Sequence, residues 1–167
     1  MNKFQTLKGF RDFLPNEKRV RDFALSKIKT TFERFGFEAI ETPTLEPADL
    51  LLGKYGTEAD KLVYTFKDKG DRNVGLRYDQ TVPTARILGQ YQDKLQKGFR
   101  RYQIQNVFRA DKPQKGRFRE FTQCDIDIFG VSSALADCEI LSCSYYAFKE
   151  LGFSPKILIN DRKVLIS

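Results

Sequence analysis

The stretch from Val107 to Gly130 constrains this chain most, because it holds two runs of alternating residues joined by a basic turn at Lys112–Gly116. Successive side chains of a strand point to opposite faces of a sheet. In the second run, one face carries Thr122, Cys124, Ile126 and Ile128, and the other carries Phe121, Gln123, Asp125 and Asp127. The first face suits a core. The second holds a ring, an amide and two carboxylates, which are costly to bury without a ligand or fixed partners. The run therefore predicts a strand with a site on one face.

The run before this turn, Gly98 to Arg109, alternates in the same way. Its expected apolar face consists of Tyr102, Ile104 and Phe108, and its polar face of Arg101, Gln103, Gln105 and Arg109. We therefore expect two neighbouring strands that turn one face toward a helix layer and leave a polar, partly open face on the other side.

Apolar residues at spacings of three and four predict a helix over Asn16 to Phe35, with Pro15 in its first turn and Gly36 at its end. Its apolar stripe consists of Val20, Phe23, Ala24, Ile28, Phe32 and Phe35. Thr81 is the predicted N-cap of a second helix that contains Pro83 and runs to about Tyr91. The acid Asp79 precedes that helix, where the helix dipole favours negative charge, and this structural role alone would explain it.

A third helix is predicted after Gly130, capped by Ser132 or Ser133 and ended by Gly152. Its expected buried stripe consists of Leu135, Leu141, Tyr145, Phe148 and Leu151. The remaining predicted elements are an irregular segment over Phe4–Leu14, strands over Phe37–Thr42 and Lys156–Asn160, a helical turn and loop over Leu45–Lys54, and a hairpin of Leu62–Phe66 with Val74–Arg77. The fold class is α+β, an antiparallel sheet flanked by helices in one domain over residues 1–167.

The 167 residues contain no apolar run long enough to span a membrane and no apolar stretch at the N-terminus, which favours a cytoplasmic protein. Three cysteines, none in a C-x-x-C pair, are expected to be reduced core residues rather than metal ligands or disulfides. The chain has no histidine, which excludes imidazole acid/base chemistry and His-ligated zinc.

The positive charge is concentrated beside and within the stretch from Val107 to Gly130. Between Leu95 and Arg119 there are eight basic residues and one acid, an excess equal to the net charge of +7 of the whole chain. Such a concentration favours a polyanion partner, either nucleotide phosphates or nucleic acid. A solvated basic hairpin would explain the charge equally well.

The polar face suits several kinds of chemistry. Arg109, with Arg117 or Arg119, offers guanidinium groups that bind phosphate oxygens as a fixed fork. Phe121 offers a surface for stacking, and the amide and acids that follow it suit amines, so the set would hold a nucleotide beside a cationic small molecule. Alternatively, the two carboxylates would do acid/base work or bind Mg²⁺, and their spacing does not choose between these roles.

Several ordered segments resemble the class II aminoacyl-tRNA synthetases, and among them the histidyl-tRNA synthetases. The run F-R-A-D-K-P-Q-K-G-R-F-R-E-F-T-Q-C-D-I-D-I-F-G is similar to the second motif of the class, and L-R-Y-D-Q-T-V-P to the amino-acid-binding segment. K-G-F-R-D-F-L-P, the long helix and F-G-F-E-A-I-E-T-P resemble the first motif, which in the class builds a dimer interface around the proline matched by Pro43. The resemblance implies a homodimer in the full-length protein.

This resemblance implies that ATP, with Mg²⁺ on its phosphates, binds at three residues. Arg109 would hold the α-phosphate and act as the catalytic group that offsets charge during attack by the substrate carboxylate. Arg117 would bind the outer phosphates, and Phe121 would stack on adenine. The basic turn Lys112–Lys115 would lie near the acceptor end of tRNA(His).

For the amino acid, the resemblance implies a subsite for histidine. Asp79, Thr81 and Gln123 would hold its α-ammonium group, Arg109 its carboxylate and Asp127 its imidazole. An acid that accepts a hydrogen bond from a ring N–H favours histidine, because most amino acids lack such a donor. No role follows for Asp125 beyond support, and Gln80, which departs from the family forms, is expected to have little effect.

Other segments of the family have no counterpart here: an R-G-L-D-Y-Y-type run, a third class motif and an anticodon-binding domain. The chain is therefore expected to be the front half of a catalytic domain, inactive alone. One alternative is a non-catalytic paralogue similar to the regulatory subunit of ATP phosphoribosyltransferase, which would not need Arg109, Arg117 and Phe121. The other is a nucleic-acid-binding module that stacks bases on Phe99, Tyr102 and Phe118, which leaves the acids unexplained.

Overall fold

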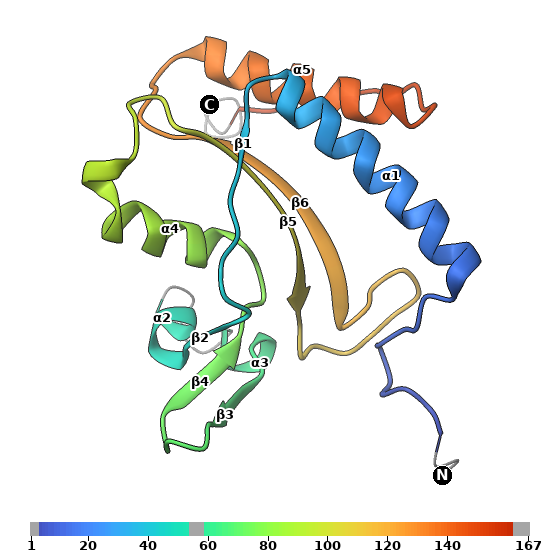
Figure 1. Cartoon of the computed structure of the whole chain (residues 1–167), viewed down its shortest axis with the longest axis vertical. Coiled ribbons are helices and arrows are strands. Elements are labelled where there is room, and N and C mark those ends of the chain that lie inside the picture. Colours follow the sequence, from blue (N-terminus) through green and yellow to red (C-terminus); the bar gives the residue numbers. More distant parts are fainter. Residues whose placement is uncertain (1–3, 54–58, 162–167) are drawn as a thin grey trace.

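A computed structural model describes residues 4–53 and 59–161 of the chain (Figure 1). Its central sheet has the order β1 (Glu38–Ala39), β5 (Arg100–Phe108) and β6 (Glu120–Ile128). The pair β5 and β6 is antiparallel, with Arg100 opposite Ile128 at one end and Phe108 opposite Glu120 at the other. The predicted α+β class and the two long strands are confirmed. The short β1 is parallel to β5, so this sheet is mixed rather than purely antiparallel.

Helices α1 (Pro15–Arg34) and α5 (Ala134–Glu150) lie against each other and cover one face of this sheet (Figure 1). The core between them is formed by Phe32, Phe37, Tyr102, Cys143 and Ala147, with Ile104, Cys124, Ile126 and Ile128 packed around it. These residues of β5 and β6 alternate as the period of two requires. The predicted apolar face of the strand pair is therefore confirmed, except that Phe108 does not belong to this cluster.

The bounds of α1 agree with the prediction, and the chain leaves the helix through Gly36 at a φ of +77°, a conformation that favours glycine. Its apolar stripe is only half buried. Ile28, Phe32 and Phe35 pack into the core, whereas Val20 and Phe23 are exposed. The first half of the helix meets the sheet through a polar contact instead, a hydrogen bond from Arg21 to Thr122.

In α5 the predicted ends are confirmed, because the Ser133 hydroxyl accepts a hydrogen bond from the Leu135 amide and Gly152 has a φ of +86°. The predicted stripe is wrong at Leu135 and Phe148, which are exposed. The residues that reach the core are Ile140, Cys143 and Ala147, a face rotated around the helix. The small side chains on that face share one cluster with Phe32 of α1.

A second, antiparallel sheet has the order β2 (Leu45–Pro47), β4 (Asn73–Leu76) and β3 (Thr65–Lys67). The helices α2 (Ala48–Leu52) and α3 (Ala59–Leu62) lie between β2 and β3 in the chain. The predicted hairpin is confirmed, but Leu62 ends α3 rather than starting a strand. The helical turn predicted within Leu45–Lys54 is present as α2, but residues 45–47 form a strand, because they pair with β4. Lys54, the last residue of that predicted segment, lies outside the described residues.

One predicted strand is shorter than expected, and another is wrong. Phe37–Thr42 contributes only the two residues of β1 to the sheet. Lys156–Asn160 pairs with no strand in the described part of the chain, and Leu158 is 83% exposed there. A strand needs a neighbouring edge to satisfy its backbone groups, and the described residues offer none at this place.

The segment before α1 is irregular, as predicted, and it is fixed to the loop between β5 and β6. The Gly9 carbonyl accepts a hydrogen bond from the Arg119 amide at 2.8 Å, and Gly9 has a φ of +91°. A Cβ at Gly9 would lie 2.9 Å from Cγ of Arg119, so the close approach needs glycine. In Figure 1, α4 (Thr81–Gln90) lies on the other side of β5 from this segment, and the short 3₁₀ helix η2 (Gln92–Lys94) follows α4 in the chain. No helix among the described residues is long and apolar enough to cross a membrane.

Candidate functional site

The second face of the β5–β6 pair carries the polar row predicted from the sequence. Its members on β6, Phe121, Gln123, Asp125 and Asp127, are all partly exposed. Directly opposite residues of an antiparallel pair share a face, and the pairing sets Arg101 opposite Asp127, Gln103 opposite Asp125 and Gln105 opposite Gln123. The structure therefore brings the predicted residues of both strands into one surface.

This face was predicted to be partly open, and its β6 side is partly exposed, whereas its β5 side is covered. Gln103 is fully buried and donates to the Thr42 hydroxyl at 2.9 Å, and Gln105 donates to the Thr42 carbonyl at 3.2 Å and accepts from the Thr42 amide at 3.1 Å. The segment that follows β1, up to Pro43, thus lies against the amides of β5 and satisfies them.

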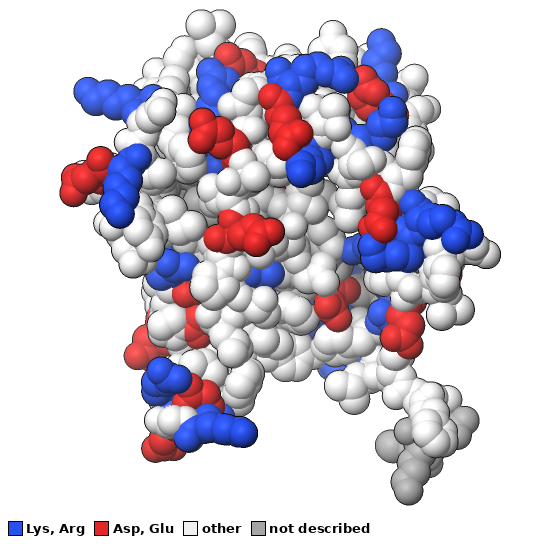
Figure 2. Space-filling view, viewed as in Figure 1, with Lys and Arg blue, Asp and Glu red and all other residues white. Residues whose placement is uncertain are grey.

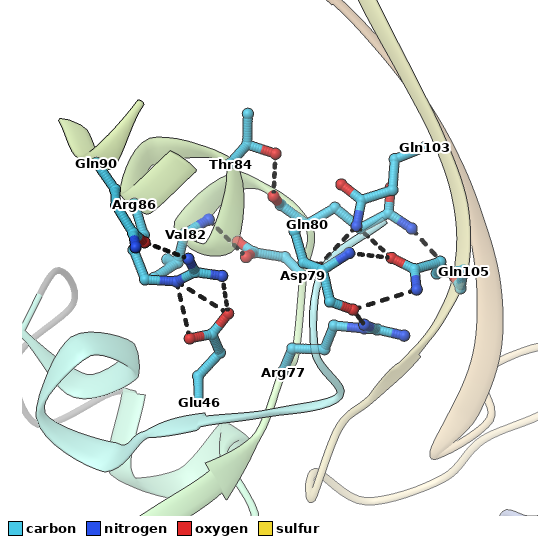
Figure 3. A network of polar contacts seen from close by, with 11 residues as sticks. Glu46, Arg77, Asp79, Gln80, Val82, Thr84, Arg86, Gln90, Gln103 and Gln105 are labelled. Carbon is cyan, nitrogen blue, oxygen red and sulfur yellow. Dashed lines mark hydrogen bonds and ion pairs between the residues drawn. The ribbon is translucent and has the colours of Figure 1, made fainter. Parts of the chain in front are cut away.

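A buried guanidinium completes this cover. Arg77 donates from Nη1 to the Thr42 carbonyl at 2.7 Å and from Nε to the Asn106 carbonyl at 2.8 Å. Burial lowers the pKa of Arg77, an effect that the nearby Glu46 partly opposes. Glu46 is itself buried, and its carboxylate accepts hydrogen bonds from two nitrogens of Arg86 on α4. The shortest of these hydrogen bonds is 2.7 Å long (Figure 3).

The start of α4 is tied to both long strands by Gln80. Its side-chain nitrogen donates to the carbonyl oxygens of Gln105 at 3.1 Å and Gln123 at 3.3 Å. The N-cap of α4 is Gln80, not Thr81 as predicted, and the Asp79 carboxylate accepts from the Val82 amide at 3.2 Å (Figure 3). This acid satisfies one of the free amides of the first turn. Thr81 is the first helical residue and is exposed.

Arg109 lies at the end of β5, where it meets both the α4 segment and β6. Its Nε donates to the Tyr78 carbonyl at 3.2 Å, and its guanidinium carbon is 5.0 Å from the centre of the Phe121 ring. The structure thus places a fixed cation beside an aromatic face.

Arg117 and Arg119, the two residues predicted as alternatives for binding phosphate, lie in the loop between β5 and β6 and differ in their contacts. Arg119 is folded back onto backbone carbonyl oxygens, including that of Asp111 at 3.1 Å. Arg117 is 62% exposed and reaches the Asp111 carboxylate only at 3.9 Å. Of the two, Arg117 is the one whose guanidinium is open to an anion.

The acids of the site lie close to one another. Burial raises the pKa of Asp125, Arg101 and Arg109 oppose that shift, and the charges of Asp127 and Asp79 add to it. Asp127 forms an ion pair with Arg101. Within the described ranges, no group of three or more acids, histidines or cysteines is arranged to hold a metal ion.

The basic excess of residues 95–119 is dispersed rather than gathered into one surface. Arg101 is buried beside Asp127, Arg100 pairs with Glu139 on α5, and Arg119 contacts the backbone. Basic and acidic side chains alternate over the face seen in Figure 2. The structure therefore gives little support to a continuous basic strip for nucleic acid.

The three cysteines are free, but only two fit the prediction of core thiols. Cys143 is buried and Cys124 half-buried, and burial raises the pKa of each thiol to about 11. Cys138 is exposed, because it lies on the outer side of α5 once the helix is rotated as described above.

The two ends of the polar row border different hollows. Asp127 lines a cavity of about 580 Å³ beside the start of α5, together with Ser132, Ser133 and Asp137. Phe121 lines another of about 520 Å³, which also borders Arg11 and Arg21.

Solved structures share this fold. An ATP phosphoribosyltransferase regulatory subunit/histidyl-tRNA synthetase from Bacillus halodurans matches with a TM-score of 0.80 and 27% identity, over 92% of this chain and 40% of that one. A histidyl-tRNA synthetase from Nostoc sp. PCC 7120 matches with a TM-score of 0.76 and 35% identity, over 87% of this chain and 34% of that one. The sheet and its helix layer are thus those of an aminoacyl-tRNA synthetase fold.

Sequence comparison identifies the family within the aminoacyl-tRNA synthetases. A family profile described as histidyl-tRNA synthetase matches residues 9–164. The histidine–tRNA ligases of Helicobacter hepaticus and Clostridium tetani are 46% and 48% identical over 162 residues, which cover 96% and 95% of this chain. The chain belongs to the histidyl-tRNA synthetase family. It spans 37% of the length of each of these two relatives.

Sequence reasoning missed the residues that hold the site together. Thr42, Arg77 and Gln80 were given no role or only a small one, because their partners are distant in sequence. Arg101 had a detectable signal, since counting the strand register back from the turn sets it opposite Asp127.

Proposed function

We propose that this chain forms the amino-acid-activating part of a class II histidine–tRNA ligase, which joins histidine and ATP into histidyl-adenylate and pyrophosphate and then passes the histidyl group to tRNA(His). The observation that carries the proposal is the position of Arg109. Its guanidinium lies between the Tyr78 carbonyl and the Phe121 ring in a chain of this family. A cation fixed there before the substrates bind suits a reaction that builds negative charge on phosphorus.

In this proposal the nucleotide lies along one end of the polar row. Arg109 contacts the α-phosphate and the histidine carboxylate, and Phe121 stacks on adenine. Arg117, with its exposed guanidinium in the loop, contacts the outer phosphates. Mg²⁺ would bind the ATP phosphates and lower their charge. The described residues offer no group of acids that would hold it alone.

The amino-acid subsite lies between α4 and β6. The Gln123 side-chain oxygen is buried without a hydrogen-bond partner among the described residues, which suits an acceptor reserved for the α-ammonium group. Asp79 uses one oxygen for the Val82 amide and has a second for the same ammonium, beside the exposed Thr81. Asp127, which is 41% exposed, would accept the imidazole N–H.

The wider assembly belongs to the same proposal. The basic turn Lys112–Lys115 would lie near the acceptor end of tRNA(His), the first motif with Pro43 would form a homodimer, and the enzyme would work in the cytoplasm. Support for the tRNA comes from Lys112 and Lys115, which are both exposed in this turn. Support for the dimer comes from the exposed Val20 and Phe23 on α1, since apolar patches on a surface mark interaction sites.

A second candidate is a histidine sensor without ligase activity. The match to the Bacillus halodurans structure, whose description includes an ATP phosphoribosyltransferase regulatory subunit, favours it. The presence of Arg109, Arg117 and Phe121 favours the ligase, because a sensor of histidine alone needs no nucleotide contacts.

Histidine-dependent exchange of pyrophosphate into ATP decides between the two, measured on the full-length protein that carries this chain. A ligase exchanges pyrophosphate into ATP when histidine is present and does not do so with any other common amino acid. Tight histidine binding without exchange would establish the sensor instead.

A further inference from the structure

Arg101 is a buried cation beneath a half-exposed acid. It lies on β5 directly opposite Asp127 on β6, and its Nη2 forms an ion pair with Oδ2 of Asp127. The Arg101 side chain is 1% exposed, whereas that of Asp127 is 41% exposed. The carboxylate is therefore held from the sheet side while part of it faces the solvent.

The direction of the guanidinium is itself fixed by buried neighbours. Nη1 of Arg101 donates to the side-chain oxygen of Gln103 at 3.4 Å, and the nitrogen of that amide donates to the Thr42 hydroxyl at 2.9 Å and to Gln105. Figure 3 shows Gln103 and Gln105 facing each other within this network. A chain of buried contacts thus runs from the Asp127 carboxylate to the segment before Pro43.

Stability alone is a poor explanation for this pair. Desolvating a guanidinium is costly, and an ion pair in an interior often contributes little net stability. In addition, Nε of Arg101 is buried with no hydrogen-bond partner among the described residues, which adds to the cost. Holding Asp127 in one orientation is a role that accounts for such a residue.

We propose that Arg101 is a positioning residue, which fixes the Asp127 carboxylate so that its free oxygen meets the ring N–H of the substrate. The inference rests on the proposed function, because that function assigns the imidazole to Asp127. A group held in its binding orientation loses less conformational freedom when the ligand arrives. In this proposal Arg101 has no contact with either substrate and acts on histidine binding through Asp127.

The test uses Arg101→Met in the full-length protein, with Arg100→Met as the matched control. Arg100 is the preceding residue of β5 and pairs with Glu139 on the helix side, so the control removes one paired arginine away from the site. Arg101→Met should raise the KM for histidine in pyrophosphate exchange by about tenfold to a hundredfold, the effect of losing one charge-assisted contact. The KM for ATP should stay within about twofold, and Arg100→Met should change neither.

A double variant shows whether Arg101 acts through Asp127. Asp127→Asn combined with Arg101→Met should bind histidine no more weakly than Asp127→Asn alone, since residues that act as one unit are not additive. Additive losses, or equal changes in the KM values of histidine and ATP, would overturn the inference. If Arg101→Met does not fold, Arg101→Lys decides, because it keeps the charge and should raise only the histidine KM, by a smaller factor.

The two proposals fail in different ways. If the wild-type protein shows no histidine-dependent exchange, the proposed function is wrong and the role of Arg101 falls with it. If the wild-type protein exchanges pyrophosphate and Arg101→Met behaves like Arg100→Met, only the role of Arg101 is wrong.

Discussion

The side-chain nitrogen of Gln80 lies 3.3 Å from the main-chain carbonyl oxygen of Gln123, which ties the start of α4 to the middle of β6. Gln80 is fully buried and also reaches the Gln105 carbonyl. Gln80→Ala removes both contacts and leaves a cavity, so we expect a loss of about 2 kcal/mol in the free energy of unfolding. Urea denaturation of Gln80→Ala and of the wild type measures this difference in the free energy of unfolding.

The control for this prediction is Gln90→Ala, at the exposed end of the same helix, where the side chain accepts a hydrogen bond from Arg86. Gln90→Ala should change the free energy of unfolding by no more than about 0.5 kcal/mol. Equal effects at the two positions would show that Gln80 is not the link between α4 and the sheet.

A second prediction concerns the ion pair of Glu46 with Arg86, which joins β2 to α4. Glu46 is 4% exposed and receives two guanidinium nitrogens. Glu46→Ala leaves a partly buried cation without its partner and should lower the free energy of unfolding by about 3 kcal/mol. Asp71→Asn, which breaks the exposed pair with Lys67 and suits the φ of +60° at this residue, should lower it by less than about 1 kcal/mol. A smaller loss at Glu46 than at Asp71 would contradict the buried pair.

The third prediction is a pH dependence at Asp125. Burial raises the pKa of this acid above 3.8, with Arg101 and Arg109 opposing the shift and Asp127 and Asp79 adding to it. The native state therefore holds the proton more tightly than the unfolded chain, and the free energy of unfolding falls as pH rises from 3.8 through the raised native value. Asp125→Asn should be more stable than the wild type at pH 7, and this gain should vanish below pH 3.8.

Thermal unfolding at a series of pH values tests the dependence at Asp125. Asp93→Asn on the exposed helix η2 controls for the loss of one negative charge. A gain at pH 7 that persists unchanged at the lowest pH would show that the Asp125 charge is not its cause.

The strand pair could be predicted from the sequence because alternation is a local property. The apolar and polar faces of β5 and β6 follow from a period of two, and the basic turn fixes which residues stand opposite each other. The ends of α1 and α5 were equally local, since Pro15, Ser133 and Gly152 act within one turn of the helix.

What failed depended on contacts between distant segments. The buried face of α5 was predicted from its largest apolar residues, but the face with Cys143 and Ala147 packs beside Phe32. The cover over the β5 side of the polar face could not be predicted, because nothing near Gln103 in sequence indicates its contact with Thr42. Asp79 was correctly given a place at a helix start, where it accepts from Val82, and its role toward substrate remains a prediction.

The most direct test of the proposed function is pyrophosphate exchange by Arg109→Ala in the full-length protein. Arg34→Ala, which removes a surface arginine paired with Glu150, serves as the control. We predict that histidine-dependent exchange falls by about a hundredfold or more in Arg109→Ala, the effect of removing one group that stabilises developing charge, and is unchanged in Arg34→Ala. Exchange by Arg109→Ala at the wild-type rate would contradict the account.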